Sequence, residues 1–189
     1  LLAIKIADKL KLSVMIITKD RYDSLARCLR SLTSQTKKPD QVIIVDQSLQ
    51  LNATVIDKFM KDLAITYTYK KKVGFGIARN VGLEIAKGDI LATIDDDGEA
   101  SRDWCENIVK AHLQNPKTLA VQGRIISKPL RLPWVFVEQI RLNRWFLDNM
   151  DRRSKMRIMS TKNVSFKLQR FRKLKLKFST ISAFNKFGA

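Results

Sequence analysis

Short apolar runs alternate, over the first part of the chain, with stretches in which apolar residues recur every three or four positions. The runs are rich in β-branched residues and predict strands at 12–18, 41–46, 65–69 and 90–94. The helical spacing predicts helices at 25–32, 55–63, 77–85 and 104–113. A further strand, broken by Gly123, is expected within 118–126. Strands and helices in this order predict an α/β fold, in which helices cover both faces of a layered sheet.

Beyond Gly123 the pattern is less regular and more basic. A helix with one apolar and one cationic face is expected within 134–149, followed by a short strand at 163–167. A basic amphipathic helix is predicted within 166–178, where four apolar residues share one helical face, Leu168, Phe171, Leu174 and Phe178. Such a helix either contacts a membrane or phosphate surface or exposes its cations to solvent.

The net charge of +18 is unevenly distributed along the chain. From Arg124 onward there are 17 Lys and Arg residues against three acidic ones, whereas the preceding part is nearly balanced. This asymmetry suggests an anionic partner, whether nucleic acid, a phospholipid surface or a phosphorylated substrate. It also divides the chain into a part at 1–123 and a basic part at 124–189.

The cysteines and the apolar runs indicate the compartment. Cys28 and Cys105 are the only cysteines and lie far apart in sequence, which favours reduced thiols over a disulfide framework. The apolar runs are too short to span a membrane, and Lys5, Asp8 and Lys9 interrupt any signal-peptide region. We therefore expect a cytoplasmic protein.

Three consecutive carboxylates, Asp95, Asp96 and Asp97, follow the apolar run at 90–94. A continuous apolar run is typical of a strand buried on both faces, and ligands of open α/β sheets bind beyond the carboxyl ends of such strands. Adjacent like charges repel, so a cation or solvent must compensate them. Hard oxygen ligands suit Mg²⁺ or Mn²⁺, although an acidic turn without ligand is the simpler alternative.

Other candidate residues end strands or begin a helix in the same part of the chain. Thr18 and Asp46 each end a predicted strand, and a carboxylate such as Asp46 can accept hydrogen bonds from a base or ribose. Arg79, near the start of a predicted helix, can bind a phosphate through two hydrogen bonds. Together with a divalent cation on Asp95 or Asp97, these residues predict a nucleoside-diphosphate site.

Several other sites are excluded by spacing. The Gly74-x-Gly76 pair lacks the third glycine of a dinucleotide fingerprint, because Arg79 stands at that position. An EF-hand starting at Asp95 fails because Ala100 replaces the required glycine. His112 is the only histidine, which excludes a histidine-rich metal site and a Ser-His-Asp triad, and it is expected on a helix surface.

Four segments in order resemble the successive motifs of family 2 glycosyltransferases, which have the GT-A fold. They are SVMIITKDR at 13–21, VIIVDQS at 42–48, GIARNVG at 76–82 and ILATIDDD at 90–97. The resemblance implies a Rossmann-like mixed sheet and transfer of a sugar from a nucleotide-sugar donor, a UDP- or dTDP-sugar, with inversion. It makes 1–123 the donor-binding domain and 124–189 a partial acceptor-binding lobe.

The resemblance also assigns roles to the candidate residues. Thr18 and Asp46 would line the nucleobase pocket, and Arg79 would face the nucleotide and its diphosphate. Asp95 and Asp97 would be the two acids of the Asp-x-Asp motif, which contact ribose and Mg²⁺ or Mn²⁺, with Asp96 between them on the nucleotide-sugar side. Lys19 and Gln47 depart from the residues usual in these motifs, which affects base selectivity more than the fold.

The general base of the resembling family lies in an acidic motif for which this chain has no matching residue before Ala189. We therefore expect the chain to be incomplete, so that it binds nucleotide and metal but transfers sugar poorly. The basic part suits a glycan or polyprenyl-linked acceptor in polysaccharide synthesis and peripheral contact with the cytoplasmic face of an anionic membrane. The alternatives are a non-catalytic partner of another transferase, a nucleotidyltransferase, and a nucleic-acid-binding module. The sequence contains no recognisable nucleic-acid-binding motif.

Overall fold

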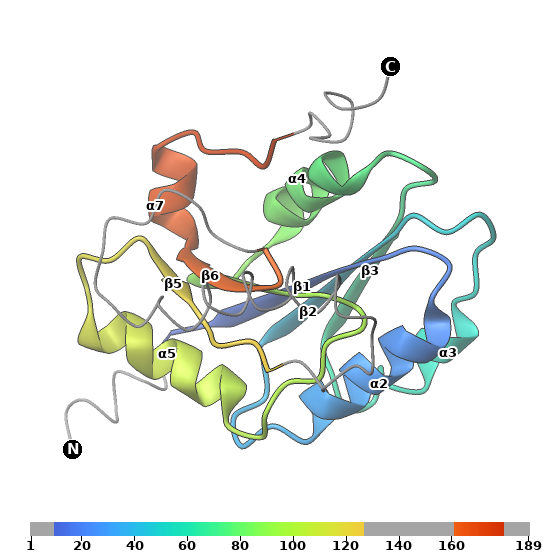
Figure 1. Ribbon diagram of the computed structural model, residues 1–189, viewed down its shortest axis with the longest axis horizontal. Helices are drawn as coiled ribbons and strands as arrows, with labels where there is room; N and C mark the ends of the chain where they lie inside the picture. Colours follow the sequence, from blue (N-terminus) through green and yellow to red (C-terminus); the bar gives the residue numbers. More distant parts are fainter. Residues whose placement is uncertain (1–9, 127–160, 180–189) are drawn as a thin grey trace, which may run out of the picture.

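The computed structural model describes residues 10–126 and 161–179, and within them the chain forms one six-stranded sheet covered by helices (Figure 1). The strands are β1 (Leu12–Thr18), β2 (Gln41–Asp46), β3 (Ile65–Tyr69), β4 (Ile90–Ile94), β5 (Ala120–Gln122) and β6 (Asn163–Lys167). The helices are α2 (Tyr22–Thr33), α3 (Thr54–Asp57), α4 (Phe75–Ile85), α5 (Trp104–Gln114) and α7 (Leu168–Lys173). The predicted helix within 134–149 lies outside the described residues.

The sheet has the order β3-β2-β1-β4-β6-β5. β1 pairs in parallel with both β2 and β4, and β2 pairs in parallel with β3, whereas β6 runs antiparallel to β4 and β5. The chain steps from β1 to β2 on one side and returns through β4 on the other. The carboxyl ends of β1, β2 and β4 therefore open on one edge, at the position where the strand order reverses.

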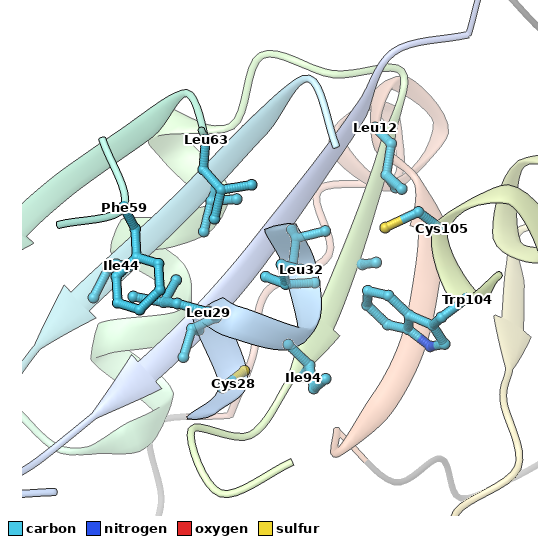
Figure 2. Packing of buried hydrophobic residues seen from close by; sticks show 14 of the residues in the cluster. Leu12, Cys28, Leu29, Leu32, Ile44, Phe59, Leu63, Ile94, Trp104 and Cys105 are labelled. Atoms are coloured by element: carbon cyan, nitrogen blue, oxygen red, sulfur yellow. The ribbon is translucent and has the colours of Figure 1, made fainter. Parts of the chain in front are cut away.

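Helices α2, α3 and α5 cover one face of the sheet, and α4 and α7 cover the other (Figure 1). Successive strand residues point to opposite faces, so Leu12, Val14 and Ile16 of β1 join the first core and Met15 and Ile17 join the second. Figure 2 shows the first core, in which side chains of α2 lie over the sheet and others from α5 and the α3 region flank them. Cys28 and Cys105 are buried in this core as free thiols, in agreement with the prediction.

Helix α4 lies unusually close to the sheet. A Cβ atom at Gly82 would overlap the Sδ atom of Met15 on β1, so only glycine allows this approach. Gly74, before the helix, has a φ of 85°, a left-handed conformation that also favours glycine. Gly82 thus allows the close packing of α4 on β1, and Gly74 allows the turn by which the chain enters the helix.

Three predicted elements are shorter than their patterns suggested. The helix expected at 55–63 ends at Asp57, because the following backbone switches to i→i+3 bonds such as Phe59 N to Ile56 O, although Phe59 and Leu63 still fill the core. The strand expected within 118–126 is limited to β5.

The third shorter element is the basic amphipathic helix expected within 166–178, and the prediction of a helix over that range was wrong. Helix α7 ends at Lys173, and Lys175 takes a left-handed φ of 52°. The chain then turns back, so that Phe178 packs on Phe166 and Phe171 while Leu174 is exposed. The periodicity could not show this reversal, because the aromatic contacts that favour it come from β6.

The prediction for His112 was also wrong, because this residue is 1% exposed. Its Nε2 atom lies 2.9 Å from the Ser165 hydroxyl, which joins α5 to β6. β6 belongs to the basic carboxyl-terminal part, yet it sits between β4 and β5, so the two parts of the chain share one sheet. The division into donor-binding and acceptor-binding parts stays a prediction.

Truncation of Leu29 to Ala in the first core should lower the free energy of unfolding by about 3 kcal/mol, since it removes buried methyl groups and leaves a cavity. The matched control is Leu49→Ala, where the leucine is 47% exposed and the change should stay within about 0.5 kcal/mol. Urea unfolding measures both. Equal effects in the two variants would contradict the assignment of this core.

Burial lowers the pKa of His112 to about 4, with Lys167 adding to the effect. As pH falls below 6.5, the ordinary pKa of histidine, His112 is protonated in the unfolded chain but not in the folded chain. The free energy of unfolding therefore decreases between about pH 6.5 and pH 4. Between about pH 7 and pH 5, the unchanged chain should lose about 2 kcal/mol more than the His112→Gln variant. Urea unfolding of both chains at the two pH values tests this, and identical losses would contradict it.

Candidate functional site

A cleft of about 220 Å³ opens at the carboxyl edge of the sheet, where β1 and β4 end. It is lined by Ile17, Arg21, Phe75, Arg79, Asp95 and Asp96. These residues come from the end of β1, the start of α2, the first turns of α4 and the loop after β4, so the site is assembled from distant parts of the sequence. Its position matches the ligand site expected at the reversal of strand order.

Asp96 points into the protein rather than toward solvent, and its side chain is fully buried. The Thr18 hydroxyl donates to its Oδ2 atom at 2.8 Å, and Arg21 forms an ion pair at 2.6 Å from Nη2 to Oδ1 and a hydrogen bond at 3.2 Å from Nε to Oδ2. Burial raises the pKa of Asp96, whereas Thr18 and Arg21 oppose that shift. Arg21 thus neutralises a carboxylate that would be costly to bury alone.

The two flanking acids remain toward the cleft and its rim. Asp95 is half-buried in the cleft wall; burial raises its pKa, and the nearby cations Lys162, Arg79 and Arg21 lower it. The Asp97 side chain is 56% exposed, and its Oδ2 atom lies 3.2 Å from Nη1 of Arg21. Among residues 10–126 and 161–179, no three His, Cys, Asp or Glu side chains converge to hold a metal ion. Asp95 and Asp97 can supply at most part of a coordination shell.

Arg79 forms the opposite wall of the cleft. It is partly buried, and its guanidinium carbon lies 5.6 Å from the centre of the Phe75 ring. Burial lowers the pKa of Arg79, although Asp95 opposes this. An arginine starts from so high a pKa that it stays charged at neutral pH. Arg79, Arg21 and the Asp95 carboxylate therefore face one small space, with Asp97 at its rim, and this space can accept a phosphate together with a divalent cation.

Asp46, at the end of β2, is buried within the protein and does not line this cleft. Its Oδ2 atom accepts hydrogen bonds from the hydroxyls of Tyr22 at 2.9 Å and Tyr67 at 2.7 Å, and its Oδ1 atom accepts one from the Ser48 amide at 2.8 Å. Burial and the Asp46 carboxylate raise the pKa of Tyr67, which therefore stays a donor. This network joins α2, β2 and β3 beside the cleft.

Residues 13–182 match the family model described as Glycosyl transferase family 2. The chain belongs to this family. The match confirms the family inferred from the four sequence motifs, and the six-stranded mixed sheet with helices on both faces confirms the expected α/β GT-A fold.

Relatives of this family 2 chain include longer proteins. A glucosyl-dolichyl phosphate glucuronosyltransferase from Haloferax volcanii is 33% identical over 135 residues, which cover 69% of this chain and 43% of the relative. Glycosyltransferase GlyA from Streptococcus pneumoniae is 28% identical over 116 residues, which cover 60% of this chain and 16% of GlyA. The chain therefore spans less than half the length of these curated relatives.

Solved structures share the fold at lower identity. The structure of S. aureus TarS 1-349 superimposes with a TM-score of 0.68 at 16% identity, over 92% of this chain and 52% of that TarS fragment. The mannosyltransferase PcManGT from Pyrobaculum calidifontis gives a TM-score of 0.66 at 21% identity, over 90% of this chain and 48% of PcManGT. Identities this low establish the common fold and nothing further.

The structure brings most of the predicted residues of this family 2 chain together. Arg79, Asp95 and Asp96 line the cleft, Thr18 contacts Asp96, and Asp97 lies at the rim. Asp46 stands at the same edge, engaged by two tyrosines. The roles assigned to these residues stay predictions.

Sequence reasoning did not single out Arg21, Phe75, Tyr22, Tyr67 or Lys162. Arg21 could have been found, because it lies three residues beyond a strand end that was already a candidate. The partners of Asp46 could not, because Tyr67 is on a different strand whose register only the folded sheet sets.

Replacement of Arg21 by Met should lower the free energy of unfolding by about 2 kcal/mol at neutral pH, because the Asp96 carboxylate loses its counter-charge. The pKa of Asp96 is already raised in the folded state, so charging this acid destabilises the fold as pH rises. The loss should therefore be smaller at about pH 5 than at about pH 7, and smaller in an Asp96→Asn background.

The control is Arg27→Met, which removes an exposed arginine that bonds only the Ser24 hydroxyl among the described contacts. Urea unfolding of the variants at both pH values measures the difference. A loss that is the same in the Asp96→Asn background would show that Arg21 does not act through Asp96.

Proposed function

We propose that this chain binds a nucleotide-sugar donor at the cleft and takes part in metal-assisted transfer of the sugar, with inversion, to an acceptor hydroxyl. The observation that carries the proposal is the meeting of Asp95, Arg79 and Arg21 in one cleft at the reversal of strand order, with Arg21 also bound to the buried Asp96. Membership of glycosyltransferase family 2 supports sugar transfer. Structures of TarS are described with UDP and UDP-GlcNAc, and that of PcManGT with GDP-Man and Mn²⁺, which supports a nucleotide-sugar donor.

In this proposal Asp95 and Asp97 hold Mg²⁺ or Mn²⁺. Their donor set fits such an ion, because two carboxylates with hard oxygen atoms leave positions for water and for the donor's phosphates, which these cations commonly retain. A bound divalent ion would neutralise charge on the departing diphosphate. Arg21 holds Asp96 in the interior, and this keeps the two flanking acids apart, one in the wall and one at the rim.

Arg79 binds the diphosphate from the opposite wall, since a guanidinium can pair with phosphate oxygens through two hydrogen bonds. Thr18 and Asp46 contribute to the nucleobase side. The Asp46 oxygens already accept three protein hydrogen bonds, two at Oδ2 and one at Oδ1, which leaves one acceptor position at Oδ1 for a base. Gln47, which departs from the residue usual in this family motif, is next to Asp46 in the sequence.

The acceptor in this proposal is a glycan or a polyprenyl-linked sugar, presented at the cytoplasmic face of a membrane. The name of the Haloferax relative includes a dolichyl phosphate substrate, which supports a lipid-linked acceptor. Lys173, Lys175 and Lys177 are exposed after the short helix α7 and can attract anionic headgroups. In the part of the chain that the structure describes, no helix is long and apolar enough to cross a membrane.

A thermal-shift panel of nucleoside diphosphates tests the donor site. One nucleoside diphosphate, at about 100 times its dissociation constant, should raise the Tm by about 5 °C with Mn²⁺ present and by much less without it. Asp97→Ala should abolish the metal-dependent part, because one of the two proposed carboxylate ligands is lost.

The control is Asp57→Ala, which removes an exposed acid on α3. That variant should keep the full metal-dependent shift. A shift that survives unchanged in Asp97→Ala would refute the proposed metal site, and the absence of a shift with every nucleotide would refute the donor site.

A further inference from the structure

Asn80, in the middle of α4, is bonded to the backbone of a residue 98 positions later in the chain. Its Nδ2 atom donates to the Phe178 carbonyl oxygen at 3.0 Å, and the Phe178 amide donates to its Oδ1 atom at 2.8 Å. A single side-chain amide thus satisfies both backbone groups of Phe178. Asparagine is a weak helix former, so local propensity does not explain its presence at this position.

The segment that ends at Phe178 is attached along α4 rather than at one point. Arg172 donates through Nη2 to the carbonyl oxygens of Leu83 at 2.8 Å, Glu84 at 3.2 Å and Ala86 at 2.9 Å, which otherwise end the helix without partners. Six residues after Arg172, Phe178 contacts Asn80. The chain therefore runs along α4 from the carboxyl end toward the amino end, and Figure 1 shows it crossing from α7 to α4.

The amino end of α4 is the part that lines the cleft. Phe75 and Arg79 both face it, and Arg79 is the immediate neighbour of Asn80. On the side of α4 that faces the sheet, Gly82 packs closely against Met15. Asn80 bonds the helix to the carboxyl-terminal segment. The position of Arg79 thus depends on two contacts, one with β1 and one with Phe178.

We propose that Asn80 is a positioning residue for the donor site, which fixes the segment 174–178 to α4 so that Arg79 is held at the cleft. This inference rests on the proposed function in one respect, namely that Arg79 faces the donor's diphosphate. The chemistry needs an amide, because only a side chain with one donor and one acceptor can match the carbonyl and the N–H of Phe178. An ionised carboxylate at this place would keep the acceptor and repel the Phe178 carbonyl.

The test compares Asn80→Asp and Asn80→Ala with the unchanged chain in titrations of UDP and of GDP, each with Mn²⁺, at about pH 8 and about pH 5.5. Both variants should bind the preferred nucleotide about tenfold more weakly at the higher pH. At the lower pH the Asp variant should recover affinity, relative to the unchanged chain, to the extent that its new carboxyl is protonated, because only the protonated form can again donate to the Phe178 carbonyl; an NMR titration of that carboxyl on the same sample measures the protonated fraction. The Ala variant should show the same deficit at both pH values.

The matched control is Asn107→Asp on α5, where the asparagine is exposed and donates to Asp103. It should bind nucleotide as the unchanged chain does at both pH values. Hydrogen exchange at the Phe178 amide, measured on the same samples, should be faster in the Ala variant and should follow pH in the Asp variant.

Nucleotide affinity that is unchanged in both Asn80 variants, while the Phe178 amide exchanges faster, would overturn the positioning role and leave the donor site intact. A deficit that persists in the Asp variant once its new carboxyl is shown to be protonated would overturn the hydrogen-bonded pairing as its cause. Failure of the unchanged chain to bind any nucleotide would instead overturn the proposed function, and this inference with it.

Discussion

The fully buried carboxylate of Asp96 is the constraint on which the arrangement of the site depends. A carboxylate can be buried only if charge and hydrogen bonds compensate it, and here Arg21 and Thr18 do so from the first strand and the helix that follows it. The pairing joins the ends of β1 and β4, the two parallel neighbours at which the strand order reverses. It also separates the neighbouring acids, leaving Asp95 in the cleft wall and Asp97 at the rim.

The second wall of the cleft has a different origin, because α4 is placed by close packing rather than by charge. The missing side chain at Gly82 lets the helix approach β1, and Arg172 satisfies the carbonyls at its far end. The resulting contacts link the amino-terminal strands to the segment after β6. Strand β6 itself lies between β4 and β5 and completes the sheet. The carboxyl-terminal residues that the structure describes are therefore part of the fold that supports the cleft.

The chain shares its packed sheet with solved structures of low sequence identity. TarS and PcManGT share the fold at 16% and 21% identity, since a sheet covered on both faces needs apolar residues of about the right size more than particular side chains. At the edge of the sheet, Asp46 is surrounded by Tyr22 and Tyr67, and Gln47 is buried beside it. A shared fold does not determine which ligand such an edge binds, because function depends on the particular side chains of the site.

The sequence by itself determined the strands at the centre of the sheet, the long helices and the family, because periodicity and four ordered motifs are local properties of the chain. Strands β1, β2, β3, β4 and β6 have the bounds that the pattern predicted, and the acids after Ile94 are at the edge where they were expected. Only the tertiary structure decided that Asp96 turns inward to Arg21, that His112 is buried against Ser165, and that the chain reverses after α7 to reach Asn80. Each of these depends on a partner more than 50 residues away, and no periodicity or spacing within one segment encodes the contact that such a partner makes.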